Sequence, residues 1–137
     1  MNYILDTNII SALMKGNDEL KRKLQVVSLR GDEVFINGIS YYEIKRGLLS
    51  ANVPKKFKIF DEICKQLKII LLDSKYIFDK ASEIWAFLKR RGKPIPDADI
   101  LIAAMVLAKG SVLVSDNTSH FQKIKGLPLK NWLREKL

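Results

Sequence analysis

The sequence contains one cysteine and one histidine in 137 residues, and it has no long apolar run. The single cysteine, Cys64, cannot form an intrachain disulfide, which excludes the class of small disulfide-stapled domains. One histidine and one cysteine are also too few for a structural zinc site, which needs a full set of nitrogen and sulfur ligands. The longest strongly apolar run, Ile100 to Ala108, is far shorter than the roughly 20 residues that a membrane-spanning helix needs.

A signal-peptide pattern is also missing before the first apolar segment, which begins at Tyr3. Together with the single cysteine, this predicts a protein of the cytoplasm, a reducing compartment. The chain is long enough to bury one hydrophobic core, and its 47% hydrophobic and 28% charged residues are typical of globular proteins. We therefore expect one domain over residues 1–137 that is not inserted in a membrane.

Positive charge is in excess: 24 Lys and Arg against 15 Asp and Glu give a formal net charge of +9. Such a surplus favours a polyanionic partner, because neutralising phosphates releases counterions from a nucleic acid. Most basic residues lie in scattered short runs, which are commonly solvated helix faces. The run Lys89 to Lys93 is the most suggestive, since it directly precedes an acidic segment with Asp97 and Asp99.

Apolar strands and helices alternate along the chain. Strands are predicted at residues 3–5, 34–37, 68–73 and 112–115, and helices at 9–14, 19–29, 40–49, 54–67, 74–91 and 96–109, with a short element near Trp132. The helix at 40–49 is expected to close at Gly47 or shortly after. Unbroken apolar strands separated by helices indicate a parallel sheet covered on both faces. The expected fold is α/β: a three-layer α/β/α domain whose central, mostly parallel sheet has about four to five strands.

Acidic residues lie where these strands end. Asp6 ends the first strand, Glu43 follows the second by one helical turn, Asp97 and Asp99 open a helix, and Asp116 ends the fourth strand. Because the carboxyl ends of parallel strands share one edge of a sheet, the acids are expected to converge there. Clustered acids repel one another unless a cation neutralises them, so the pattern predicts a metal site.

Each acid also has a purely structural explanation, which is favoured when that acid is taken alone. Asp6 is a good helix N-cap, and Glu43 has the spacing of a capping box. Asp97 and Asp99 can complement a helix dipole, and Asp116 can be a turn residue. The grouping of the acids in a basic protein is what favours a metal.

Carboxylate oxygens select a hard cation, so Mg²⁺ or Mn²⁺ is expected. Such an ion can activate water and stabilise charge on a phosphoryl group. Combined with the basic surface, the acid pattern predicts hydrolysis of a phosphodiester.

Four ordered segments resemble the PIN-domain nucleases and, more narrowly, the VapC toxins of type II toxin–antitoxin systems. They are residues 5–11 (LDTNIIS), 39–47 (ISYYEIKRG), 99–104 (DILIAA) and 113–117 (LVSDN), the last followed by His120-Phe121 and Gly126-Leu127. The resemblance implies an endoribonuclease that cleaves RNA with Mg²⁺ or Mn²⁺. It also implies a homodimer that is silenced by a small VapB-type antitoxin.

By this resemblance, Asp6 and Asp99 match the family's two principal metal carboxylates, and Glu43 matches its third acid. The position of the fourth acid is open, because many relatives have this acid where this chain has Asn117. Either Asp116 replaces it from one residue earlier, or the site contains only three acids. The predicted catalytic and metal-binding set is Asp6, Glu43, Asp99 and Asp116. On a regular helix, residues two apart point about 200° from each other, so only one acid of the 97–99 pair faces the metal, and the resemblance selects Asp99.

Thr7, Asn8 and Ser11 are implied to orient Asp6 and waters. Two other protein classes fit less well. A haloacid-dehalogenase-like phosphatase needs a second Asp where Asn8 stands, and a receiver domain needs paired acids after its first strand, where this chain has only Asp6. The alternative function is a PIN-like nucleic-acid-binding or RNA-processing module without a toxin role.

Overall fold

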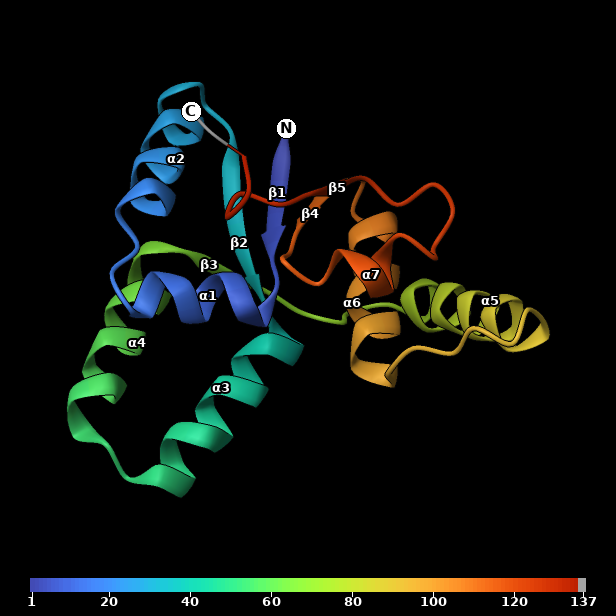
Figure 1. The fold of residues 1–137 in the computed structure, drawn as a ribbon, viewed down its shortest axis with the longest axis horizontal. Helices are drawn as coiled ribbons and strands as arrows, with labels where there is room; N and C mark the ends of the chain where they lie inside the picture. The colour runs from blue at the N-terminus through green and yellow to red at the C-terminus, as the bar shows by residue number, and fades with distance from the viewer. Residues whose placement is uncertain (136–137) are drawn as a thin grey trace.

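Five parallel strands form the centre of residues 1–135, the part of the chain that the computed structural model describes, in the order β3-β2-β1-β4-β5 (Figure 1). The strands are β1 (Asn2–Leu5), β2 (Glu33–Asn37), β3 (Lys68–Ile70), β4 (Val112–Val114) and β5 (Leu129–Lys130). Every neighbouring pair is parallel, as the alternation of strands and helices predicts. The last two residues of the expected 1–137 domain lie outside the described residues.

Helices cover both faces of this sheet. They are α1 (Thr7–Met14), α2 (Asp18–Leu29), α3 (Gly38–Ala51), α4 (Pro54–Gln66), α5 (Lys75–Arg90), α6 (Asp97–Ala108) and α7 (Thr118–Phe121). Figure 1 shows α1 to α4 on one side of the strands and α5 to α7 on the other. Within residues 1–135, no helix combines the length and the apolar content that crossing a bilayer requires.

Alternating side chains of the strands enter two separate cores. Along β1, Tyr3 and Leu5 pack with residues of α1 to α4, whereas Ile4 between them packs with residues of α5 and α6. All three side chains are buried. Because successive residues of a strand face opposite sides, an apolar strand of this kind must be covered on both faces. The predicted three-layer α/β/α fold is confirmed.

The register aligns the carboxyl ends of the central strands. Leu5, the last residue of β1, lies beside Ile36 of β2 and Val114 of β4. The residues that follow, including Asp6 and Ser115, therefore leave the sheet at one edge. The backbone N–H of Asp6 confirms the alignment, since it donates to the carbonyl of Val114 at 2.9 Å.

Some boundaries differ from the sequence prediction. The third strand, expected over residues 68–73, ends at Ile70. The helix α7 lies where no element was predicted, and β5 lies close to the short element expected near Trp132. The helix expected to close near Gly47 continues to Ala51, because one exposed glycine weakens a helix interior without ending it and the buried Leu48 keeps packing. Cys64 is partly buried in α4, and burial raises the pKa of its thiol.

Asn52 ends α3 in the left-handed region, with a φ of 52°, where most L residues are strained. Its side chain is exposed, so backbone conformation dominates the effect of replacing it. We predict that Asn52→Ala lowers the free energy of unfolding by about 1 kcal/mol, whereas Asn52→Gly leaves it unchanged or raises it. Urea denaturation of both variants measures the difference, and equal stabilities would contradict this account of the helix end.

Candidate active site

Asp6 is the most deeply buried acid at the carboxyl edge of the sheet, with 4% of the residue exposed. It caps α1, because its Oδ1 accepts a hydrogen bond from the Thr7 backbone N–H at 2.8 Å. Its Oδ2 accepts a hydrogen bond from the Ser115 hydroxyl at 2.7 Å. The structural explanation of Asp6 as a cap is therefore correct. A second role is compatible with it, since Oδ1 of Asp6 has a further acceptor position.

The pKa of the Asp6 carboxyl is raised above its ordinary value, mainly because burial removes the water that stabilises its charge. Hydrogen bonds from Ser115 and Thr7 oppose this rise. The negative charges of Asp99 and Glu43 add to it. The charges of two carboxylates from distant parts of the chain therefore act on Asp6 at this edge.

A buried asparagine fixes the start of the helix that carries Glu43. Asn37 caps α3 by accepting a hydrogen bond from the Ser40 backbone N–H at 2.8 Å, and its side-chain amide donates to the carbonyl of Leu5 at 2.9 Å. The start of α3 is thus attached to the end of β1. Because the cap is Asn37, Glu43 lies in the second turn, beyond the position that a capping box requires. The capping-box explanation of Glu43 is wrong.

Glu43 is held by Thr7 instead. Oγ1 of Thr7 lies 2.9 Å from Oε1 of Glu43 and 2.8 Å from Oγ of Ser40. A hydroxyl has one proton, so Thr7 donates to only one of these oxygens at a time. Thr7 therefore positions two acids: its backbone N–H binds Asp6, and its side chain contacts Glu43.

Asp99 lies in the first turn of α6 and contacts the loop and short helix after β4. Its Oδ2 lies 2.7 Å from Nδ1 of His120 and 3.4 Å from Nδ2 of Asn117. The side chain of Asp99 is 15% exposed. None of the side-chain hydrogen bonds found within residues 1–135 uses its Oδ1, so this oxygen is available to a ligand.

Asp97 has different surroundings. It lines a groove between α5 and α6 together with Phe78 and Trp85. Both Asp97 and Asp99 belong to the regular helix α6, so their side chains diverge as the helical phase predicts. Of the two, Asp99 is the acid whose charge influences Asp6.

The carboxylate of Asp116 turns toward the C-terminal segment. Its Oδ1 accepts a hydrogen bond from Nδ2 of Asn131 at 2.8 Å and lies 3.5 Å from Nε of Arg134. Its backbone N–H donates to Oδ1 of Asn8 at 2.9 Å. The structure therefore brings Asp116 to the correct edge, with its carboxylate bound to partners outside the acid cluster.

Asn117, the next residue, is the one whose side chain reaches the cluster, through its contact with Asp99. Among the residues expected to support Asp6, Asn8 contributes an amide 3.4 Å from Oδ2 of Asp6. Ser11 takes part in no side-chain hydrogen bond found within residues 1–135. The three acids Asp6, Glu43 and Asp99 thus share the edge with the amides of Asn8 and Asn117.

These donors suit a hard cation, because they are carboxylate oxygens in partly buried surroundings. As the side chains stand, no three of the His, Cys, Asp and Glu residues in the described part of the chain are grouped closely enough to hold an ion by themselves. Mg²⁺ usually keeps several waters and takes only one or two protein carboxylates directly. The acid edge therefore fits a hydrated ion of this kind.

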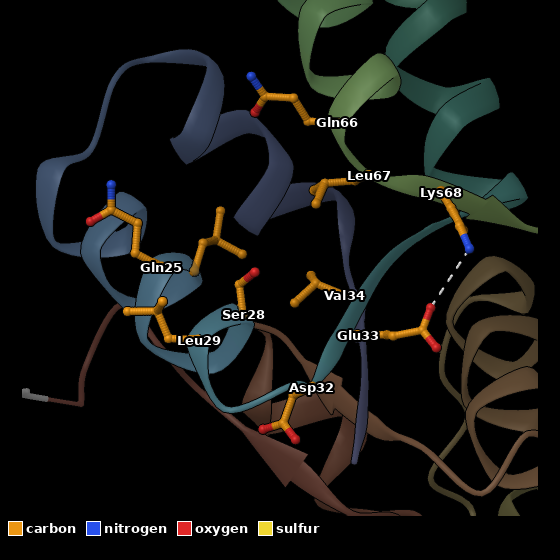
Figure 2. Close-up of a pocket in the computed structure, with 10 residues that line it drawn as sticks. Gln25, Ser28, Leu29, Asp32, Glu33, Val34, Gln66, Leu67 and Lys68 are labelled. Carbon is orange, nitrogen blue, oxygen red and sulfur yellow. Dashed lines mark ion pairs between the residues drawn. The ribbon is translucent and has the colours of Figure 1, made fainter.

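A cavity of about 650 Å³ lies elsewhere, between α2 and the start of β3 (Figure 2). Figure 2 shows Gln25, Ser28 and Leu29 on one side of it and Leu67 and Lys68 on the other. It is also lined by Glu33, the first residue of β2, whereas Asp6 follows the last residue of β1. This cavity is therefore separate from the acid edge.

Sequence reasoning gave no role to several polar residues that bind the predicted site residues or the ends of their helices, among them Asn37, Ser115 and Asn131. Asn37 appeared only as the end of a strand, although a polar residue between an apolar strand and a helix is a recognisable cap signal. Asn131, the partner of Asp116, follows the two-residue strand β5, which has too few residues for a periodic pattern.

Comparison with known proteins agrees with this geometry. Residues 3–127 match the family model described as PIN domain. The chain is 28% identical over 136 residues to ribonuclease VapC1 of Haemophilus influenzae strain R2866, covering 98% of this chain and 100% of that protein. It is 31% identical over 127 residues to ribonuclease VapC1 of Methanocaldococcus jannaschii, covering 93% of this chain and 84% of that protein.

Among solved structures, the fold matches a chain of VapBC2 from Rickettsia felis bound to a DNA fragment from its promoter. The TM-score is 0.90 with 27% sequence identity, and the match covers 96% of this chain and 99% of that chain. The family model, the relatives and the fold all extend over most of the sequence. The chain therefore belongs to the PIN domain family.

Proposed function

We propose that this protein, as one PIN domain over residues 1–137, is a metal-dependent endoribonuclease that acts in the cytoplasm as the toxin of a type II toxin–antitoxin pair. The observation that carries the proposal is the convergence of Asp6, Glu43 and Asp99 at one edge of the sheet in a chain with a net charge of +9. The relatives named as VapC ribonucleases favour RNA as the substrate. The similarity to a chain of VapBC2 favours a VapB-type antitoxin as partner.

The proposed ligands of Mg²⁺ or Mn²⁺ are Asp6, Glu43 and Asp99. When bound, such an ion activates water and stabilises charge on the phosphoryl group. The chain contributes fixed positions: Thr7 and Ser115 hold both oxygens of Asp6 in one orientation. Pre-organised ligands of this kind bind an ion without first losing rotamer freedom.

For the fourth position, Asp116 belongs to the predicted catalytic and metal-binding set, but its carboxylate would have to leave Asn131 to reach an ion. Asn117 already faces Asp99. We therefore favour a site with three acids in which Asn117 occupies the fourth position.

The proposed partners have two candidate surfaces. A VapB-type antitoxin would cover the acid edge with a segment that offers Arg or Lys to the carboxylates. A second copy of the chain would cover large apolar side chains that lie exposed on α5 and after β3, namely Leu71, Tyr76, Phe78 and Trp85. This exposed group supports the homodimer that the resemblance implies.

The function is tested by comparing two neighbouring acids in an RNA cleavage assay. We predict cleavage of total cellular RNA with Mg²⁺ or Mn²⁺ and its loss in excess EDTA. Asp99→Asn should reduce the cleavage rate by more than about 100-fold, because loss of a metal ligand costs more than loss of a residue that only supports one. Asp97→Asn, the matched control on the same helix turn, should keep most of the activity.

Undiminished cleavage in EDTA would contradict the metal requirement, and equal losses in the two variants would contradict the assignment of Asp99. A wild-type chain that binds RNA without cleaving it, and that leaves growth normal when expressed alone, would favour the alternative of a PIN-like binding or RNA-processing module.

The raised pKa of Asp6 predicts a pH-dependent stability difference in metal-free protein. Below the pKa of Asp6 in the unfolded chain, the carboxyl is protonated in both states and its burial has no charge cost. As the pH rises through the raised pKa of the folded state, Asp6 ionises in the folded protein and the free energy of unfolding falls. Asp6→Asn keeps the helix cap and removes the charge. In EDTA, the thermal midpoint of Asp6→Asn should therefore exceed that of the wild type near neutral pH, and the difference should shrink at acid pH. A variant less stable than the wild type at neutral pH would refute the prediction.

RNA binding should depend steeply on salt even when cleavage is disabled by Asp6→Asn. We predict that affinity falls by about 10-fold or more between roughly 50 and 200 mM salt, because several phosphates are neutralised. Replacing Arg90 and Lys93 together by Gln should reduce the salt slope, since both are exposed in the suggestive basic run. The matched control replaces the exposed pair Lys55 and Lys56. Fluorescence anisotropy measures the RNA affinity of both double variants as a function of salt. Equal salt slopes in the two variants would exclude a special role for the run Lys89 to Lys93 in RNA binding.

A further inference from the structure

His120 is the only histidine of the chain, and it contacts an acid of the proposed metal site. Its Nδ1 lies 2.7 Å from Oδ2 of Asp99, within the range of a strong charge-assisted hydrogen bond. His120 belongs to the short helix α7, which is anchored by the fully buried Phe121 beside it. The imidazole is therefore held against Asp99 by the core of the domain.

The contacts of Nδ1 determine where the imidazole proton lies. An ionised Asp99 can only accept hydrogen bonds, so Nδ1 must carry a proton to bind it. The alternative is that Nδ1 accepts from Nδ2 of Asn117, which lies 2.9 Å away. That arrangement would place the lone pair of Nδ1 against a negatively charged oxygen at 2.7 Å, which is repulsive. The charge-assisted bond to Asp99 decides in favour of a protonated Nδ1, and the amide of Asn117 then points to the same Oδ2.

This bond constrains the orientation of the carboxylate. With Oδ2 bound by His120, the rotation that would exchange the two oxygens is blocked. Oδ1 then remains the oxygen that Asp99 presents to the acid edge. Residues that bind the second oxygen of a ligating carboxylate orient it and raise the affinity for the metal.

We infer that His120 is a positioning residue, whose Nδ1–H fixes Asp99 so that its free oxygen is presented to the divalent cation. The inference rests on the proposed metal-dependent function. It gives His120 a role in metal binding, although the three acids could be proposed as ligands without it.

The proton position can be measured without metal. Because the sequence has one histidine, a long-range ¹H–¹⁵N spectrum of tag-free protein contains a single imidazole, whose two nitrogens can be assigned directly. The expected result is a protonated Nδ1. A neutral ring protonated only on Nε2 would overturn the inference, because such a ring cannot donate to Asp99.

Metal affinity tests the consequence. Calorimetric titration with Mn²⁺ should give a dissociation constant about 10-fold or more weaker for His120→Ala than for the wild type. His120→Asn should restore much of the affinity, because its amide nitrogen takes the place of Nδ1. His120→Gln, whose amide takes the place of Nε2, should not. Gln122→Ala is the control, because Gln122 is exposed and lies two residues after His120. This variant should bind Mn²⁺ as tightly as the wild type does.

The comparison of Asn with Gln separates positioning from stability, since both variants remove the ring and both keep a polar side chain. Thermal midpoints of all variants show whether each is folded, and if His120→Ala is not, the Asn and Gln pair carries the test. Equal Mn²⁺ affinity in the wild type, Asn and Gln variants would overturn the inference and leave the proposed function standing. A wild-type protein that binds no Mn²⁺ would overturn both.

Discussion

Burial of the Asp6 carboxylate at an edge of the sheet that it shares with two further acids is the constraint on which the rest of this structure depends. Asp6 has lost nearly all contact with water and also experiences the charges of Glu43 and Asp99. Asp6 and Glu43 are supported by neutral donors, a backbone N–H and two hydroxyls, which orient the oxygens without cancelling the charge. The arrangement is therefore incomplete by itself, and a divalent cation is the simplest group that would complete it.

Separate elements supply the groups that hold these acids in place. Thr7 begins α1, Ser115 follows β4, Asn37 ends β2 and His120 lies on α7. Each element packs into one or both of the two cores, so the positions of the acids depend on the packing of the whole domain. A core substitution far from the edge can therefore change the site, because interiors transmit small displacements instead of absorbing them.

The sequence predicted the features that depend on local patterns. Apolar runs identified β1 to β4, and the rule that parallel strands end at one edge placed Asp6, Glu43 and Asp99 together. Directions of single side chains were beyond such reasoning: Asp116 and Asn117 are neighbours, yet Asp116 turns outward to Asn131 and Asn117 turns inward to Asp99. β5 is too short, at two residues, to show a periodic pattern. It is recognised as a strand only by its pairing with β4. The catalytic roles of these residues remain predictions.

β1 lies at the centre of the sheet although it is the first strand along the chain. Its neighbour β4 is far away in sequence, and Asp6 is separated from Ser115 by 109 positions. During synthesis β2 emerges before β4, so a nascent chain that has not reached β4 leaves one edge of β1 without its partner strand. Asp6 obtains its hydroxyl partner only when β4 inserts. A fragment that ends before β4 contains the three acids but lacks the Ser115 hydroxyl that orients Asp6.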